Sequence, residues 1–426
     1  MAEPVDPRTA VDAVWRTESA RVVGALTRMV HDVGLAEELA QDALVAALEQ
    51  WPSSGVPRNP GAWLTTIAKR RAIDRFRREE TLDRKHRQIA RDLETQLTAG
   101  ADAEADLDGE IEDDLLRLMF VSCHPVLTTE ARTALTLKLL GGLTTAEIAR
   151  AFLLSEATLA QRIVRAKRAL TAAQVPFEVP SADELPARLG SVLEVIYLIF
   201  NEGYSATAGD DWLRPEMCSE ALRLGRLLAD LLSREEEVHG LVALMEIQAS
   251  RTSARTGPDG RPVLLLDQDR ARWDQLQIRR GLAALDRAEA LTDSPGRYTM
   301  QAAIAACHAR AATAEDTDWE RIAALYLDLA RLEPSPVVEL NRAVALSMAR
   351  GPAVGLAIVD RIRGDPALRG YHLLPSVRGD FLAHLFRFAE AALEFEQAAS
   401  LTRNEAERAL LLDRAAACAR GELPEH

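Results

Sequence analysis

The chain has few aromatic residues and no long apolar run. Aromatic residues make up 5% of its 426 residues, and the most continuous apolar stretch is VIYLIF at 195–200. A membrane-spanning helix needs about 20 apolar residues, so the sequence predicts no span. The start, MAEPVD, lacks the basic and then apolar pattern of a signal peptide. We therefore expect a cytoplasmic protein without a membrane partner.

Cysteine is also scarce, and its spacing argues against two kinds of site. Cys123, Cys218, Cys307 and Cys418 are scattered without a C-x-x-C pair, which argues against a disulfide framework and a zinc finger. The sequence also lacks a P-loop, G-x-G-x-x-G, H-E-x-x-H and G-x-S-x-G. We predict buried, reduced thiols, and we expect no metal site, no cofactor and no enzymatic activity.

Charge is distributed unevenly along the chain. The net charge is −14, yet residues 58–91 hold 11 basic and 4 acidic side chains and residues 130–170 hold 7 basic and 3 acidic ones. Between them, residues 92–116 hold 10 acidic side chains and no basic one. Attraction to phosphate is local, because the Debye length is about 8 Å at physiological salt. The two basic segments therefore keep nucleic-acid binding open despite the negative total.

The first basic segment lies on a predicted helix. NPGAWLTTIAKRRAIDRFRRE enters a helix at Pro60, and Trp63 is expected to pack inside the domain. Six cations follow within ten residues, more than solubility requires. They are Lys69, Arg70, Arg71, Arg75, Arg77 and Arg78.

The second basic segment, TTAEIARAFLLSEATLAQRIVRAKRAL at 144–170, predicts two short helices. Thr144 or Thr145 can cap the first with support from Glu147, and Ser155 can cap the second. An apolar stripe at helical spacing contains Leu159, Ile163, Ala166 and Leu170. Opposite it lies a polar, basic face, as in a helix-turn-helix whose second helix enters the major groove. The alternative is an ordinary helical hairpin with a solvated basic surface. The candidate groove contacts are Thr158, Gln161, Arg162, Arg165 and Arg168.

Abundant alanine and leucine predict an all-α fold. We expect a helical domain at 1–91, a flexible acidic linker at 92–112, a helix-turn-helix domain at 113–175 and a helical extension at 176–426. Near 317–420, Ala323, Ala357 and Ala391 are each 34 residues apart, a spacing that resembles the tetratricopeptide repeat. The alternative is unrelated alanine-rich helices in a chance register.

Three motifs in order strongly resemble the extracytoplasmic-function sigma factors of bacterial RNA polymerase. GLAEELAQDALVAALEQWP is similar to the region 2 helix that docks on the polymerase clamp, and AWLTTIAKRRAIDRFRRE is similar to the part that holds the minus-ten element. GGLTTAEIARAFLLSEATLAQRIVRAKRAL is similar to the region 4 helix-turn-helix that reads the minus-thirty-five element. Two positions depart from the family: Arg70 replaces a common Asn, and Leu153 replaces the usual Gly of the turn.

The resemblance implies two partners, core RNA polymerase and promoter DNA, and a role for each matched residue. Polymerase binding is implied for Glu38, Leu39, Gln41 and Asp42. Contact with the minus-ten element is implied for Lys69, Arg71, Arg75 and Arg78, to which we add Arg70. Two other functions remain open: a helix-turn-helix regulator with a repeat-type sensor that binds operators alone, and a repeat scaffold that does not bind DNA.

The long extension resembles a narrower branch of that family. In such relatives a helical extension takes part in controlling activity, and a small YCII-like protein is often encoded alongside. The extension from Thr171 to His426 carries a net charge of −11. Contact between this acidic segment and the basic DNA-binding faces in a resting state is one hypothesis for such control.

Overall fold

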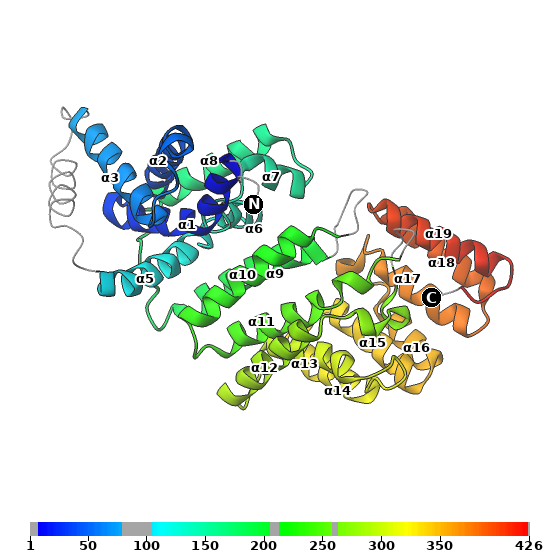
Figure 1. Ribbon diagram of the computed structural model, residues 1–426. Coiled ribbons are helices and arrows are strands. Elements are labelled where there is room, and N and C mark those ends of the chain that lie inside the picture. Colours follow the sequence, from blue (N-terminus) through cyan, green and yellow to red (C-terminus); the bar gives the residue numbers. More distant parts are fainter. Residues whose placement is uncertain (1–6, 79–103, 205–212, 258–262, 425–426) are drawn as a thin grey trace. The chain divides into compact units, whose positions relative to one another are not determined.

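The computed structural model describes residues 7–78, 104–204, 213–257 and 263–424. Regular structure within these ranges is helical, and they contain no β-strand, which confirms the predicted all-α fold. The helices form two compact units, Met1–Leu198 and Ile199–His426 (Figure 1). In the same ranges no helix is both long and apolar enough to cross a bilayer.

Unit 1 (Met1–Leu198) begins with three helices that pack against one another. Its helices are α1 (Pro7–Val30), α2 (Val33–Ser54), α3 (Pro60–Arg78), α5 (Glu104–Ser122), α6 (Thr129–Leu139), α7 (Thr145–Ala151), α8 (Glu156–Ala172) and the first part of α9 (Leu185–Tyr204). Leu26, Leu39 and Leu64 contribute one buried side chain from each of α1, α2 and α3. Trp63 meets Trp51 edge to face at 5.2 Å, which confirms its predicted packing role.

Helix α5 begins inside the segment predicted as a flexible linker. Residues 92–103 of that segment lie outside the described residues, whereas Glu104 onward is helical. The apolar spacing of Leu107, Ile111, Leu115 and Leu118 explains this difference, since it continues a helical period through the acidic sequence.

Helix α5 also packs on α1, where a Cβ atom at Gly24 would lie 3.3 Å from the Cβ of Asp114. Asp114 is 1% exposed and accepts from Arg28 of α1 at 3.0 Å. The two helical domains that the sequence suggested as separate therefore lie in one compact unit.

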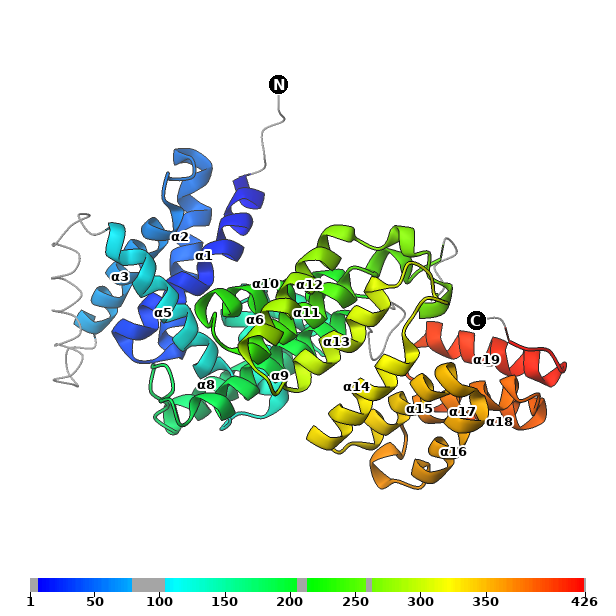
Figure 2. The same ribbon diagram turned by 90° about the horizontal axis from the view of Figure 1, so that it is seen from below.

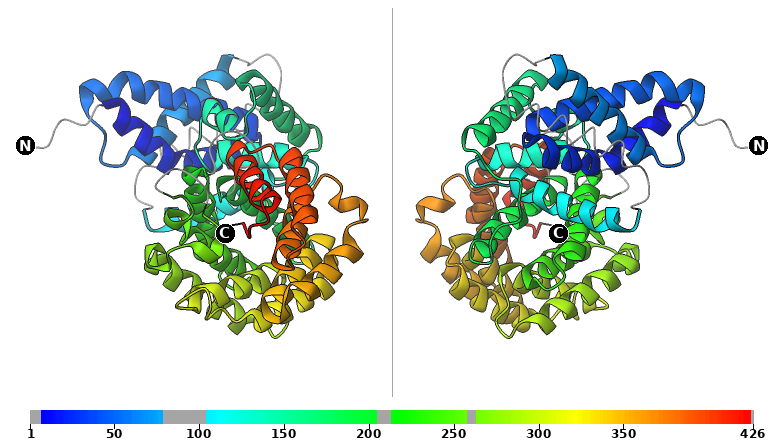
Figure 3. Two further views of the ribbon diagram at one scale, coloured as in Figure 1. Left: turned by 90° about the vertical axis from the view of Figure 1, so that its right-hand side faces the viewer. Right: turned by 90° about the vertical axis from the view of Figure 1, so that its left-hand side faces the viewer.

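Unit 2 (Ile199–His426) is built of helices that pack on their neighbours in the chain (Figures 2 and 3). After the end of α9 they are α10 (Pro215–Leu231), α11 (Glu236–Ala249), α12 (Gln275–Leu291), α13 (Arg297–Arg310), α14 (Trp319–Leu332), α15 (Pro336–Arg350), α16 (Pro352–Ile362), α17 (Leu373–His384), α18 (Phe388–Leu401) and α19 (Glu405–Ala419). From α14 onward each helix packs on the next.

The 34-residue spacing coincides with three helix pairs. Ala323, Ala357 and Ala391 lie in α14, α16 and α18, the first helices of the pairs. Ala323 and Ala391 are buried, but Ala357 is exposed, and Leu356 and Val359 fill the core of the middle pair instead. The helix pairs are thus present, while their assignment to the tetratricopeptide family stays a prediction.

The four cysteines are unpaired thiols. Cys123, Cys218 and Cys418 are buried, as predicted, and Cys307 is half-buried. Burial raises the pKa of Cys123 to about 11 and that of Cys218 to about 12, so both thiols stay protonated at neutral pH.

Candidate nucleic-acid interface

The cations of α3 point in more than one direction. Arg70, Arg71 and Arg75 are exposed, and Lys69 is half-buried. Arg71 and Arg75 lie one turn apart and face α2, whereas Arg70 is rotated by about 100° from Arg71. Arg78 is the last residue of α3, and its side chain lies outside the described residues. We call Arg71 and Arg75, which share one side of the helix, the basic face of α3.

The polymerase-binding residues suggested by the sequence separate into surface and core. Glu38, Gln41 and Asp42 are exposed on α2, and we call them the acidic face of α2. Leu39 is 1% exposed and packs in the core, so its side chain cannot meet a partner on this surface. One and two turns after Gln41, Val45 and Leu48 are 49% and 37% exposed. Sequence reasoning missed these two, although the i, i+4, i+7 spacing from Gln41 pointed to them.

The acidic face of α2 and the basic face of α3 are paired with each other. Arg75 donates to Glu38 at 2.9 Å, and Arg71 lies 3.8 Å from Asp42. All four side chains are at least 42% exposed. Exposed ion pairs of this kind contribute about 0–1 kcal/mol each, so external phosphates or cations can replace either partner.

The helix-turn-helix has both of the predicted N-caps. Thr144 accepts from the backbone N–H of Glu147, whose side chain accepts from the backbone N–H of Thr144, a complete capping box. Ser155 caps α8 by accepting from the backbone N–H of Thr158 at 3.2 Å. The predicted apolar stripe is buried throughout, at 5% exposure or less. It contains Leu159, Ile163, Ala166 and Leu170.

Gln161, Arg165 and Arg168 lie on the side of α8 opposite this stripe, and Thr158 and Arg162 lie at the edges of that side; we call these five residues the groove face. Gln161, Arg165 and Arg168 are exposed, and Arg162 is half-buried. Thr158 is exposed, and its hydroxyl shares a 2.8 Å hydrogen bond with that of Ser155. Amide and guanidinium groups on one face of a capped helix can hydrogen-bond base edges and phosphates.

The turn between α7 and α8 has the shape that glycine usually provides. Leu153 adopts φ of 51°, in the left-handed region. Its N–H bonds to the carbonyl of Arg150, and the N–H of Leu154 bonds to the carbonyl of Ala149 at 2.8 Å, the pattern of a Schellman motif. The departure from glycine therefore leaves the turn intact and places backbone strain at an exposed leucine.

Charged residues join α2 to the helix-turn-helix domain. Glu37 of α2 has a side chain only 6% exposed, and it forms an ion pair with Lys167 of α8. Lys138 of α6 lies 3.8 Å from the same carboxylate. Burial lowers the pKa of both lysines, and a nearby carboxylate opposes that shift in each case, Glu147 for Lys138 and Asp32 for Lys167.

Two further contacts join α1 and α2 to the helix-turn-helix domain. Thr171 donates to Asp32, the N-cap of α2, at 3.0 Å, and Arg16 of α1 donates to Glu147 at 2.6 Å. Gly142 has φ of 63°, and a Cβ atom there would lie 2.8 Å from Oγ of Ser19. The loop before α7 therefore reaches α1 closely only because it lacks a side chain at this position.

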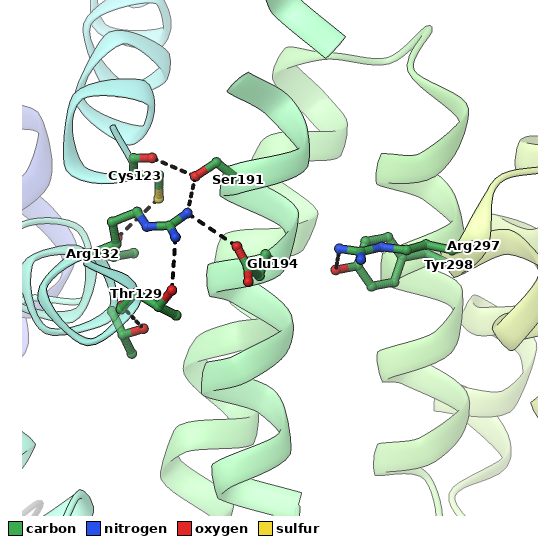
Figure 4. A network of polar contacts seen from close by, with 9 residues as sticks. Cys123, Thr129, Arg132, Ser191, Glu194, Arg297 and Tyr298 are labelled. Atoms are coloured by element: carbon green, nitrogen blue, oxygen red, sulfur yellow. Dashed lines mark hydrogen bonds and ion pairs between the residues drawn. The ribbon is translucent and has the colours of Figure 1, made fainter. Parts of the chain in front are cut away.

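A polar network ties the start of α9 to α5 and α6 (Figure 4). Arg132 of α6 donates to Ser191 and, at 3.2 Å, to Glu194, both on α9. Ser191 in turn donates to the carbonyl of Cys123 at 2.7 Å, and Arg188 donates to that of Phe120 at 2.8 Å. Sequence reasoning assigned no role to these residues, because the partners are about 60 positions apart.

Three known families match parts of the chain that contain these helices. Sigma-70 region 2 matches residues 14–81, sigma-70 region 4 matches residues 117–170, and a family of unknown function, DUF6596, matches residues 188–289. An uncharacterized protein of Rhizobium meliloti (strain 1021) is 43% identical over 94% of each chain. No solved structure is significantly similar to the chain.

Named relatives cover the first part of the chain. The ECF RNA polymerase sigma factor SigK of Mycobacterium sp. (strain KMS) is 33% identical over 36% of this chain and 77% of its own length. SigK of Mycobacterium ulcerans (strain Agy99) is 31% identical over 35% of this chain and 78% of its own length. The chain therefore belongs to the extracytoplasmic-function sigma factors of the sigma-70 family. Sigma factors bind core RNA polymerase and promoter DNA.

Proposed function

We propose that this sigma factor binds core polymerase through the acidic face of α2 and promoter DNA through the basic face of α3 and the groove face of α8. The observation that carries the proposal is the exposure of these charged side chains on three capped or packed helices of one unit. Val45 and Leu48 add apolar area beside the acidic face, as expected of a protein-binding surface. The protein then acts in the cytoplasm, where polymerase and chromosome are.

The proposed contact with polymerase and the proposed contacts with DNA require side chains of opposite charge. Exposed carboxylates on α2 suit a basic protein partner and would repel phosphate. The cations of α3 and α8 suit phosphates, and each contact adds about 0.9 to the slope of log affinity against log salt. Gln161 suits adenine and the arginines suit guanine, which makes α8 the better candidate for reading bases.

Transcription in vitro with bacterial core polymerase tests this proposal. The templates are promoter fragments selected by binding to the protein and core enzyme together. We expect E38A/D42A to lose polymerase binding, and R162A/R165A to keep it while losing promoter selection. R331A/R363A removes two exposed arginines of unit 2 and serves as the charge-matched control for R162A/R165A. Full activity of both test variants would reject the assigned surfaces, and transcription without added protein would reject a sigma role.

We propose in addition that the extension, with tetratricopeptide-like helix pairs, controls activity through α9. The support is the network of Arg132, Ser191 and Glu194, which joins the matched part of the family of unknown function to α6. We expect Arg132→Met to alter promoter-dependent transcription with polymerase affinity unchanged, and Arg331→Met to alter neither. Equal transcription by the two variants would reject control of activity through α9. Co-purification from the native cell tests whether a small YCII-like protein is the extension's partner.

A further inference from the structure

Unit 2 contains a cavity of about 430 Å³ that the proposed contacts with polymerase and DNA do not use. Cavities that hold small ligands in proteins usually measure about 300–1,000 Å³. Much of the lining is apolar and comes from the loop between α11 and α12 and from α14, α15 and α17. These apolar residues include Leu264, Leu265, Leu266, Trp319, Val344 and Phe381.

The polar groups of the lining lie mainly on one face of α17. Ser376, Asp380 and His384 follow one another at intervals of four residues and therefore share that face. Arg414 of α19 reaches the same place, where its Nη2 donates to Oδ1 of Asp380. The cavity thus combines apolar walls with a few polar groups close together, as in sites that bind and orient small molecules.

Arg414 has more hydrogen-bond donors than the protein satisfies. The residue is 7% exposed, and its Cζ lies 4.5 Å from the ring centroid of Phe395. A guanidinium carries five N–H groups, whereas within the described ranges Asp380 is the one acceptor of Arg414. In the same ranges its Nε is buried without a hydrogen-bond partner. A buried donor without an acceptor is unfavourable, so an acceptor supplied by a ligand stabilises this site.

The charges in the cavity balance one another. Arg414 and Asp380 form an ion pair, and Nδ1 of His384 lies 3.7 Å from Oδ2 of Asp380. A carboxylate on the ligand would be repelled by Asp380, and an ammonium group by Arg414. Because removing a further charge from water is also costly, a neutral acceptor such as a carbonyl oxygen fits this site best.

We propose that this cavity binds a neutral, largely apolar small molecule, and that Arg414 donates a hydrogen bond to a carbonyl oxygen of that molecule. The binding site itself rests only on contacts within unit 2 and not on the proposed contacts with polymerase or DNA.

The cavity is connected to the end of α9. The ligand packs against the loop that contains Leu264, and the N–H of Val263 in that loop bonds to the carbonyl of Arg255 at 2.8 Å. The guanidinium of Arg255 lies 3.7 Å from the ring centroid of Tyr204, the last residue of α9. A bound ligand therefore stabilises a loop that contacts the helix through which we expect the extension to act. This consequence alone rests on the proposed function.

The fluorescent probe prodan tests the site, because it is a neutral naphthalene that carries a ketone. We expect the full chain to bind one prodan molecule saturably. The matched naphthoate, which carries a carboxylate in place of the ketone group, should bind about tenfold more weakly or worse. No saturable binding of prodan, or equally tight binding of the naphthoate, would overturn the proposal.

Filling the cavity shows where the probe binds. Ser376→Trp adds a large side chain to the lining and should abolish saturable binding. Ser400→Trp makes the same change at an exposed position of α18 and should leave binding intact. Equal binding by these two variants would mean that prodan binds only to other apolar surfaces, which would also overturn the proposal.

Arg414→Met tests the hydrogen bond to the ketone. We expect binding about tenfold weaker than in the parent chain, and prodan emission at shorter wavelength because the ketone has lost its donor. Arg331→Met, at an exposed arginine of α14, should change neither. Unchanged affinity and emission in Arg414→Met would contradict the role of Arg414.

Hydrogen exchange of the parent chain provides a measurement that needs no variant. Prodan should slow amide exchange in α17 and in residues 263–268, which line or flank the cavity. Protection absent from both segments would place the probe elsewhere and overturn the proposal. A failure of promoter-dependent transcription would reject the proposed function and leave these binding measurements unaffected.

Discussion

Leu153 offers a sharp test of the helix-turn-helix geometry, because the ordinary ranking of alanine and glycine should reverse there. A non-glycine residue in the left-handed region costs about 1–2 kcal/mol, whereas glycine costs about 0.4–1 kcal/mol through the freedom of the unfolded chain. The φ of 51° at Leu153 therefore makes Leu153→Gly more stable than Leu153→Ala by about 1 kcal/mol. Both variants lose the same half-exposed side chain, so its contacts cancel in the comparison.

Amide hydrogen exchange of α7 and α8 measures this difference, since it reports local stability in a chain of two units. A difference of 1 kcal/mol corresponds to about fivefold slower exchange in the glycine variant. Ala160, exposed inside α8, is the control, and its change to glycine should cost about 1 kcal/mol. If Leu153→Ala protects α8 as well as Leu153→Gly does, the left-handed turn is refuted.

Three further predictions concern burial, packing and charge. Burial and the nearby Arg251 and Arg270 lower the pKa of His308 from 6.5 to about 3, so the unfolded state binds a proton that the folded state rejects. Unfolding free energy should then fall by about 2 kcal/mol from pH 7 to pH 5 in the parent, and by less in His308→Gln; equal slopes in denaturant titrations would contradict this. A Cβ atom at Gly240 would lie 2.6 Å from the backbone N of Thr299, so Gly240→Ala should destabilise α11 by about 1–3 kcal/mol in hydrogen exchange. Gly190→Ala, with open space around it, should not destabilise α9. The double variant E38R/R75E keeps an ion pair between these two positions with its charges exchanged, but it should not bind polymerase. Binding of this variant in a pull-down with core enzyme would mean that the pair has only a structural role.

Local sequence patterns predicted the helices and their faces well. The stripe from Leu159 to Leu170 is buried as its spacing indicates, and the caps at Thr144 and Ser155 form as their residue types indicate. Leu39 shows where motif matching is weaker than periodicity. It lies among the polar residues of the polymerase-binding motif, but the spacing of Ala36, Ala40 and Ala43 places it on the core face.

The sequence by itself determined the all-α class, the two basic segments and the order of the sigma regions, because each depends on residues within a few turns of one another. Only the tertiary structure decided that Glu37 meets Lys167 across 130 positions and that Arg132 reaches α9. Periodicity tells which face of a helix is buried, but not which distant helix covers it. That choice follows from the packing of all the helices of a unit, and in this protein it joins sigma regions 2 and 4 in one compact unit.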